Sequence, residues 1–220
     1  MTDFLSDRRG ILRAGLALGL ATALPVPFLT PVFAQARALR PTPAQTEGPY
    51  YPDRMPSDVD NDLVQMMGRP GGGSGTITHL MGRVTDTQGT PLAGLTVEIW
   101  QCDANGAYRH SRDPRGSGAD PNFQGYGRTA TAADGGYQFR TIQPVPYPGR
   151  TPHIHMAVSQ GATRRLVTQV YIEGFAGNER DGVLRSAGDA EGRALLMARF
   201  EPAPGIEAGA LRARFDIVLA

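Results

Sequence analysis

The chain has little cysteine, histidine or net charge. Cys102 is its only cysteine, so no intramolecular disulfide and no multi-cysteine metal site can form. The formal net charge of +1 gives no electrostatic reason to expect nucleic acid or an anionic membrane as a partner. Only 4 histidines are present. Two of them, His153 and His155, occur two positions apart, which makes that segment the first place to look for chemistry.

Glycine and proline are abundant, with 28 and 18 residues, and this favours a turn-rich β protein. A length of 220 residues suits one domain, or one domain with an appendage. Short alternating segments separated by turn residues predict strands at 76–84, 95–101, 136–142, 153–159, 165–173 and 210–219. Residues 188–200 fit either a helix or a loop leading to a strand. The sequence therefore predicts an all-β fold, a two-sheet β-sandwich over residues 76–220 with long loops, including a surface loop from 108 to 136.

The N-terminal 75 residues depart from this pattern. Residues 1–34 contain Arg8-Arg9, an apolar run interrupted by prolines, and small residues near Ala34. This is typical of a twin-arginine signal peptide cleaved after Ala34, with no stable membrane insertion afterwards, whereas an uncleaved anchor is the alternative. We therefore expect a periplasmic or secreted protein. Residues 35–75, rich in proline and glycine, are predicted to form an extended arm.

The two histidines lie in RTPHIHMAV, a segment typical of a β-strand. Side chains alternate between the faces of a strand, so His153 and His155 point one way while Ile154, Met156 and Val158 point toward the core. Two solvated histidines are the ordinary interpretation of such a pair. The other interpretation is a shared metal ion, which needs further ligands.

Two tyrosines are candidates for those ligands. Tyr108 follows the turn DANGAY, and Tyr147 lies in PVPYPGR, just before the histidine strand. Taken singly, Tyr108 is as readily a packing residue and Tyr147 a surface aromatic. Two phenols together with two imidazoles favour a hard ion such as Fe(III), because its charge can remove a phenol proton of pKa about 10. Zinc sites, by contrast, usually use cysteine, histidine and carboxylates.

Five segments resemble the intradiol ring-cleavage dioxygenases, and most closely the protocatechuate 3,4-dioxygenase branch. They are TEGPYYP, GRVTDTQGTPLAGLTVEIWQCDANGAY, FQGYGRTATAADGGYQFRTI, YPGRTPHIH and TQVYIEG. The link from Tyr147 to His153 is shorter than in the well-known members, which affects the rim of the pocket, and those members work in the cytoplasm. The resemblance implies four iron ligands, a catalytic arginine and an active-site glutamine: Tyr108, Tyr147, His153 and His155, then Arg150 and Gln169.

The resemblance implies a non-haem Fe(III) enzyme. Its substrates would be O2 and a small catechol-type aromatic diol, cleaved between the two hydroxyl-bearing carbons to a cis,cis-muconate-type dicarboxylate. The resemblance further implies that Tyr147 leaves the iron and takes up a substrate proton. Arg150 would stabilise negative charge that develops during oxygen attack, and Gln169 would position the intermediate.

The sequence leaves the diol and the oligomeric state open, and a homo-oligomer is compatible with it. We expect the segments that select the diol to be 109–124 and the arm around Tyr50 and Tyr51. Two other functions compete with the dioxygenase. One is a non-catalytic exported β-sandwich binding module, and the other is a hydrolase or oxidase that uses the same ligands with another metal.

Overall fold

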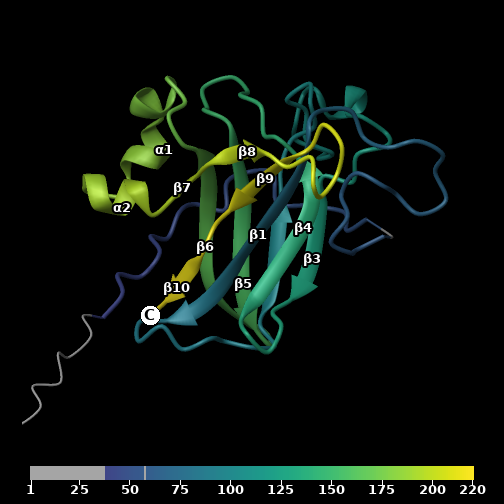
Figure 1. Cartoon of the computed structure of the whole chain (residues 1–220). Helices are drawn as coiled ribbons and strands as arrows, with labels where there is room; N and C mark the ends of the chain where they lie inside the picture. The colour runs from purple at the N-terminus through teal and green to yellow at the C-terminus, as the bar shows by residue number, and fades with distance from the viewer. Residues whose placement is uncertain (1–37, 57) are drawn as a thin grey trace, which may run out of the picture. The chain divides into compact units, whose positions relative to one another are not determined.

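The computed structural model describes residues 38–56 and 58–220, which are predominantly β (Figure 1). The predicted signal peptide, residues 1–34, lies outside this part, so its cleavage and the export of the protein stay predictions. Within the described ranges, no helix has the length and apolar character needed to cross a membrane.

The first sheet is built around the strand β1 (Ile77–Asp86). The strand β4 (Gly136–Ile142) pairs with it antiparallel. Two short strands, β9 (Leu211–Arg214) and β10 (Ile217–Leu219), pair with it successively in parallel, and β8 (Phe200–Pro202) adds to β9.

The second sheet has the order β3-β2-β5-β6-β7. Its strands are β2 (Thr96–Trp100), β3 (Tyr126–Ala130), β5 (His153–Gln160), β6 (Thr163–Ile172) and β7 (Met197–Ala198). The histidine strand β5 is therefore central, between β2 and β6. The two sheets confirm the predicted all-β fold with two sheets.

Apolar side chains of both sheets share one buried cluster. Ile154, Met156 and Val158 of β5 belong to it, as do Leu80 of β1 and Phe139 of β4, each no more than 1% exposed. This confirms the face of β5 that the alternation assigned to the core.

The opposite face of β5 is buried as well. A second cluster covers it, formed by Trp100, Cys102, Tyr108, Tyr126 and Ala157 with the partly buried Tyr50, Tyr51, Val59, Val145, Tyr147 and Val167. His153 and His155 are each only 1% exposed. The interpretation as two solvated histidines is therefore wrong, because aromatic side chains and the arm exclude water from this face.

The arm ties the sheets together along its length. The N–H groups of Thr42 and Gln45 donate to carbonyls of β10 and β6, at 2.9 and 2.8 Å. Further along, Asp60 O accepts from β3, and Leu63 N donates to β4, each at 2.8 Å. Leu63 is fully buried in the inter-sheet cluster. These bonds lie before and after Tyr50, Tyr51 and Val59, so they hold the part of the arm that belongs to the second cluster.

Two predictions about strand boundaries are wrong. The expected surface loop from 108 to 136 contains β3, which includes Gly127. A Cβ at Gly127 would lie 2.4 Å from Leu63 Cδ1, so glycine is needed there because the arm packs directly on this strand. The expected single strand 210–219 is divided between β9 and β10, with a break at Phe215 and Asp216.

Two short α-helices lie between β6 and β7, α1 (Gly182–Arg185) and α2 (Ala190–Ala194), after the 3-10 helix Asn178–Arg180. Each begins at an aspartate whose side chain accepts hydrogen bonds from N–H groups of the first turn, Asp181 for α1 and Asp189 for α2. Residues 188–200 thus contain the helix α2 and then β7 and the start of β8. Both interpretations of this segment, a helix or a loop leading to a strand, are therefore partly right.

Candidate metal centre

Strand register places His153 and His155 beside each other at the centre of the second sheet. His155 lies opposite Trp100 of β2 and Gln169 of β6, and His153 lies opposite Tyr171. The two Nε2 atoms are 3.2 Å apart. His153 Nδ1 lies 2.7 Å from Thr151 O. A carbonyl can only accept, so Nδ1 holds the proton and Nε2 presents a lone pair to the site.

Burial keeps both imidazoles neutral. It lowers the pKa of His153 to about 4, and the positive charge of Arg150 acts in the same direction. Burial also holds the pKa of His155 well below its usual value, with further contributions from His153 and Arg150. A neutral imidazole is the form that binds metal ions, so these rings need lose no proton to become ligands near neutral pH.

These depressed values predict that the metal-free protein is sensitive to acid. Between pH 6.5 and about 4, His153 binds more protons in the unfolded state than in the folded state. The free energy of unfolding should therefore decrease as the pH falls through this window, with His153 contributing up to about 1.4 kcal/mol per pH unit. Urea unfolding of the metal-free protein across the window measures this slope. His153→Gln should reduce it, and an unchanged slope in that variant would contradict the assignment.

A tight turn brings Tyr147 back to the histidines. Arg150 N donates to Tyr147 O at 2.9 Å, Pro148 occupies the second turn position, and Gly149 has φ +83°. This combination is typical of a type II turn. Tyr147 Oη lies 3.5 Å from His153 Nε2. The short link from Tyr147 to His153 therefore still delivers the phenol to the imidazoles.

Tyr108 lies next to both Tyr147 and His155. Its ring centroid is 5.6 Å from that of Tyr147 and 6.2 Å from that of His155. Its hydroxyl is buried and has no hydrogen-bond partner within residues 38–56 and 58–220. Burial raises the pKa of Tyr108 well above its ordinary value, with the neighbouring Tyr147 adding to the effect, and burial raises that of Tyr147 as well.

Tyr108, Tyr147, His153 and His155 thus form a four-residue cluster that fits a metal ion. An unpartnered buried hydroxyl is costly, and coordination would satisfy it. The phenols stay protonated in this apolar setting unless a strong positive charge removes their protons. No group of three or more His, Cys, Asp or Glu residues that could hold a metal occurs in 38–56 and 58–220, so phenolates would have to complete this donor set.

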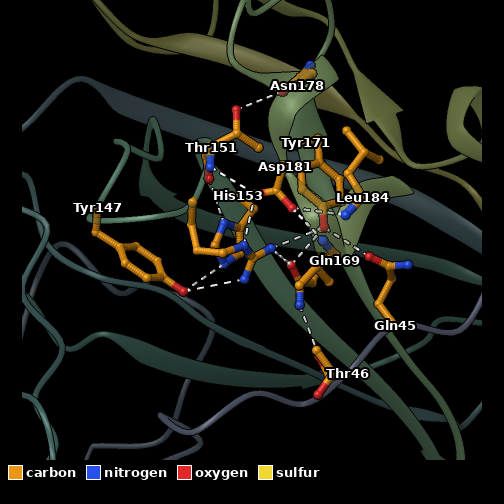
Figure 2. A network of polar contacts seen from close by, with 12 residues as sticks. Gln45, Thr46, Tyr147, Thr151, His153, Gln169, Tyr171, Asn178, Asp181 and Leu184 are labelled. Carbon is orange, nitrogen blue, oxygen red and sulfur yellow. Dashed lines mark hydrogen bonds and ion pairs between the residues drawn. The ribbon is translucent and has the colours of Figure 1, made fainter. Parts of the chain in front are cut away.

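Arg150 and Gln169 lie directly beside the cluster. Figure 2 shows the polar network that contains Tyr147, His153 and Gln169. Arg150 Nη1 is 3.4 Å from Tyr147 Oη, and Arg150 Nη2 donates to Gln169 Oε1 at 2.6 Å. Gln169 Nε2 donates to Thr46 O of the arm at 3.0 Å. All six residues singled out from the sequence are therefore in one place, with the guanidinium held between the phenol of Tyr147 and the amide of Gln169.

The sequence reasoning missed Tyr171, Asp181 and Gln45. Tyr171 Oη lies 2.8 Å from Gln169 Oε1 and 2.9 Å from Gln45 Oε1, so its single proton goes to one of these two acceptors. Period two along β6 could have found Tyr171, because it shares a face with Gln169. Asp181 and Gln45 come from distant loops and carry no comparable signal.

The segments expected to select the diol meet near Tyr108. Tyr50 stacks on the Tyr108 ring at a centroid distance of 4.7 Å, and Tyr51 Oη donates to Glu98 Oε1 at 2.9 Å. Residues of 109–124 and of the arm line a cavity of about 990 Å³ that also borders Tyr108.

Comparison with known proteins identifies related sequences and structures. The family model Dioxygenase_C, described as Dioxygenase, matches residues 46–220. The protocatechuate 3,4-dioxygenase beta chain of Burkholderia cepacia is 36% identical over 179 residues, which are 78% of this chain and 76% of the relative. A hydroxyquinol 1,2-dioxygenase of Corynebacterium glutamicum is 31% identical, covering 81% of this chain and 64% of the relative.

Similar solved structures are also dioxygenases. The dioxygenase domain of a dioxygenase carbohydrate-binding protein fusion from Streptomyces sp. SirexAA-E is 31% identical, with a TM-score of 0.61 over 82% of this chain and 98% of that chain. An intradiol ring-cleavage dioxygenase from Tetranychus urticae shares the fold, with a TM-score of 0.63 at 21% identity over 82% of this chain and 94% of that chain. The chain belongs to the intradiol ring-cleavage dioxygenase family.

Proposed function

We propose that the protein is a non-haem Fe(III) dioxygenase that opens the ring of a catechol-type aromatic diol between its two hydroxyl-bearing carbons. The observation that carries the proposal is the four-residue cluster, in which two phenols and two neutral imidazoles converge beside a buried guanidinium. Tyr108, Tyr147, His153 and His155 would hold the iron. Bound there, Fe(III) would supply Lewis acidity and a template for the two deprotonated hydroxyls of the diol.

Tyr147 is the residue suited to move a proton. Its side chain is only partly buried and sits on a turn, whereas Tyr108 is 3% exposed. Its hydroxyl oxygen also has Arg150 Nη1 within 3.4 Å, which favours a phenolate. We therefore assign Tyr147 Oη as the acceptor of a proton from the incoming diol, and Tyr108 as the ligand that remains.

Arg150 and Gln169 would act on the organic substrate. The guanidinium of Arg150 is a permanent positive charge in a site largely shielded from water, so it stabilises negative charge that develops on the ring during oxygen attack. The amide oxygen of Gln169 accepts from Arg150 and its amide nitrogen donates to Thr46 O, so the side chain is held in one position. A fixed amide can orient the substrate while its ring opens.

The substrate and the assembly are proposed from the relatives. Similarity to the protocatechuate 3,4-dioxygenase beta chain supports a substituted aromatic diol as substrate, with the cavity beside Tyr108 and Tyr50 offering room for a substituent. The alpha chain of the Burkholderia cepacia enzyme is also related, at 31% identity, which supports an oligomer.

The test is the colour and oxygen uptake of the iron-loaded protein. Phenolate bound to Fe(III) gives a visible charge-transfer band, so we expect a red-brown protein that consumes O2 with at least one diol from a panel of catechol, protocatechuate, hydroxyquinol and larger diols. The zinc-loaded protein is the control and should be colourless and inactive. A colourless iron-loaded protein would contradict phenolate ligation and favour a binding module.

A further inference from the structure

We propose that Asp181 is a positioning residue of the site, which fixes the guanidinium of Arg150 so that it faces Tyr147 and Gln169. The inference rests on the proposed function, because it matters for turnover only if Arg150 acts on the substrate. Asp181 precedes α1 and is 12 residues beyond Gln169 in the chain. Its contacts join the start of α1 to the segment that carries Arg150 and Thr151 (Figure 2).

The carboxylate of Asp181 divides its two oxygens between two tasks. Oδ1 accepts from the N–H groups of Val183 and Leu184, at 3.0 and 2.9 Å, and so caps α1. Oδ2 accepts from Arg150 Nε at 2.8 Å and from Thr151 N at 2.9 Å. A helix cap requires only one of these oxygens. The second oxygen is therefore committed to the segment that carries Arg150 and leads into His153.

The geometry of the guanidinium makes this contact decisive for its orientation. The group is planar, so holding Nε restricts the plane in which both terminal nitrogens lie. With Nε on Asp181, Nη1 faces Tyr147 Oη at 3.4 Å and Nη2 faces Gln169 Oε1 at 2.6 Å. Without an acceptor at Nε, only the contacts of the terminal nitrogens hold the guanidinium, so its plane can tilt away from the phenol.

The ion pair between Asp181 and Arg150 is buried, so Asp181 also balances the charge of the guanidinium. The side chain of Asp181 is fully buried and that of Arg150 is 15% exposed. Burial alone would raise the pKa of Asp181, but hydrogen bonds from Leu184, Thr151 and Arg150 outweigh it and hold that pKa below its ordinary value. The carboxylate is thus ionised, and it compensates a positive charge that would otherwise be buried alone.

Asp189 provides a matched control elsewhere in the fold. It caps α2 through Oδ1, which accepts from Gly192 N at 2.7 Å, and it pairs with Arg40 at 2.9 Å. These side chains are 63% and 37% exposed, and neither contacts the four-residue cluster. Asp189→Asn therefore makes the same chemical change at a helix cap and an arginine pair outside the site.

The experiment compares Asp181→Asn with Asp189→Asn in the iron-loaded full chain. Asparagine keeps an oxygen for the N–H groups of α1 but offers Arg150 Nε a donor instead of an acceptor. We expect kcat to fall about 10- to 100-fold in Asp181→Asn, the usual effect of losing a hydrogen bond to a charged group, with a much smaller change in KM. Asp189→Asn should match wild type. If Asp181→Asn does not fold, Asp181→Ser supplies a capping hydroxyl and should show the same loss.

A double-mutant cycle separates positioning from a general loss of structure. If Asp181 acts through Arg150, Arg150→Gln and Arg150→Gln/Asp181→Asn should have the same kcat. Additive losses would overturn the inference.

Crystal structures of wild type and Asp181→Asn test the inference without turnover. The guanidinium of Arg150 should be displaced by about 1 Å or more in the variant, enough to impair catalysis. An unmoved guanidinium overturns the role of Asp181, whereas an inactive wild type with a displaced guanidinium in Asp181→Asn overturns the proposed function alone.

Discussion

Replacing His153 or His155 with alanine should abolish iron binding, visible colour and ring cleavage together. Both rings present nitrogen to the same point, with their Nε2 atoms 3.2 Å apart, and both are buried and neutral. Loss of an outer partner of a metal ligand already costs about 10- to 100-fold in affinity, so loss of a ligand itself should cost more. Iron content, the visible spectrum and oxygen uptake measure the three effects in the same samples.

His79→Ala is the control for these variants. His79 Nε2 lies 3.0 Å from Glu207 Oε2, away from the four-residue cluster, so its loss should leave iron and colour at the wild-type level. A His153 or His155 variant that kept both colour and activity would remove that histidine from the ligand set.

The two tyrosines should fail in different ways when changed to phenylalanine. Tyr108→Phe removes the deeply buried phenol, which has no hydrogen-bond partner in the described part of the chain, so iron should bind weakly and little colour should remain. Tyr147→Phe removes the phenol that we propose the substrate displaces, so iron and part of the band should survive. Turnover should still fall by roughly 100- to 10,000-fold, because the proposed proton acceptor is gone.

Iron content, spectrum and kcat of both variants distinguish these outcomes. Tyr137→Phe serves as the control, because Tyr137 donates to Phe215 O in the inter-sheet cluster and should affect stability but not iron. Equal iron loss in Tyr108→Phe and Tyr147→Phe would refute their separate roles. Full activity in Tyr147→Phe would exclude it from the site.

Much of the second sheet could be predicted from local pattern alone. The alternation in 153–159 assigned both faces of β5 correctly, because a strand in a sandwich must bury one apolar face. The pattern could not show that the histidine face is buried too, since its cover comes from Trp100 and Tyr108 and from an arm more than 90 residues earlier in the chain.

The errors in the fold arose where packing overrides local signals. The expected loop from 108 to 136 contains β3, and Gly127 of this strand is glycine because the arm at Leu63 leaves no room for a side chain. The alternation from Leu211 to Leu219 continues through the break between β9 and β10, so burial pattern alone could not locate it.

The site, like the fold, combines residues that the sequence could indicate with residues that only tertiary packing brings together. The histidines could be named from their spacing, whereas Arg150 and Gln169 could be named only from the resemblance to the family. Asp181 and Gln45 act from distant loops, and only the tertiary structure brings them to Arg150 and Tyr171.

Isotope analysis of the product tests the central proposal most directly. Intradiol cleavage inserts both atoms of one O2 molecule into the diol and consumes no other reductant. Turnover of a catechol under ¹⁸O2 by the iron-loaded protein should therefore give a cis,cis-muconate-type dicarboxylate in which both added oxygen atoms are labelled, one in each new carboxyl group. A quinone without label would identify an oxidase, and a ring-opened semialdehyde would show cleavage outside the two hydroxyl-bearing carbons. Either product would contradict the proposed function.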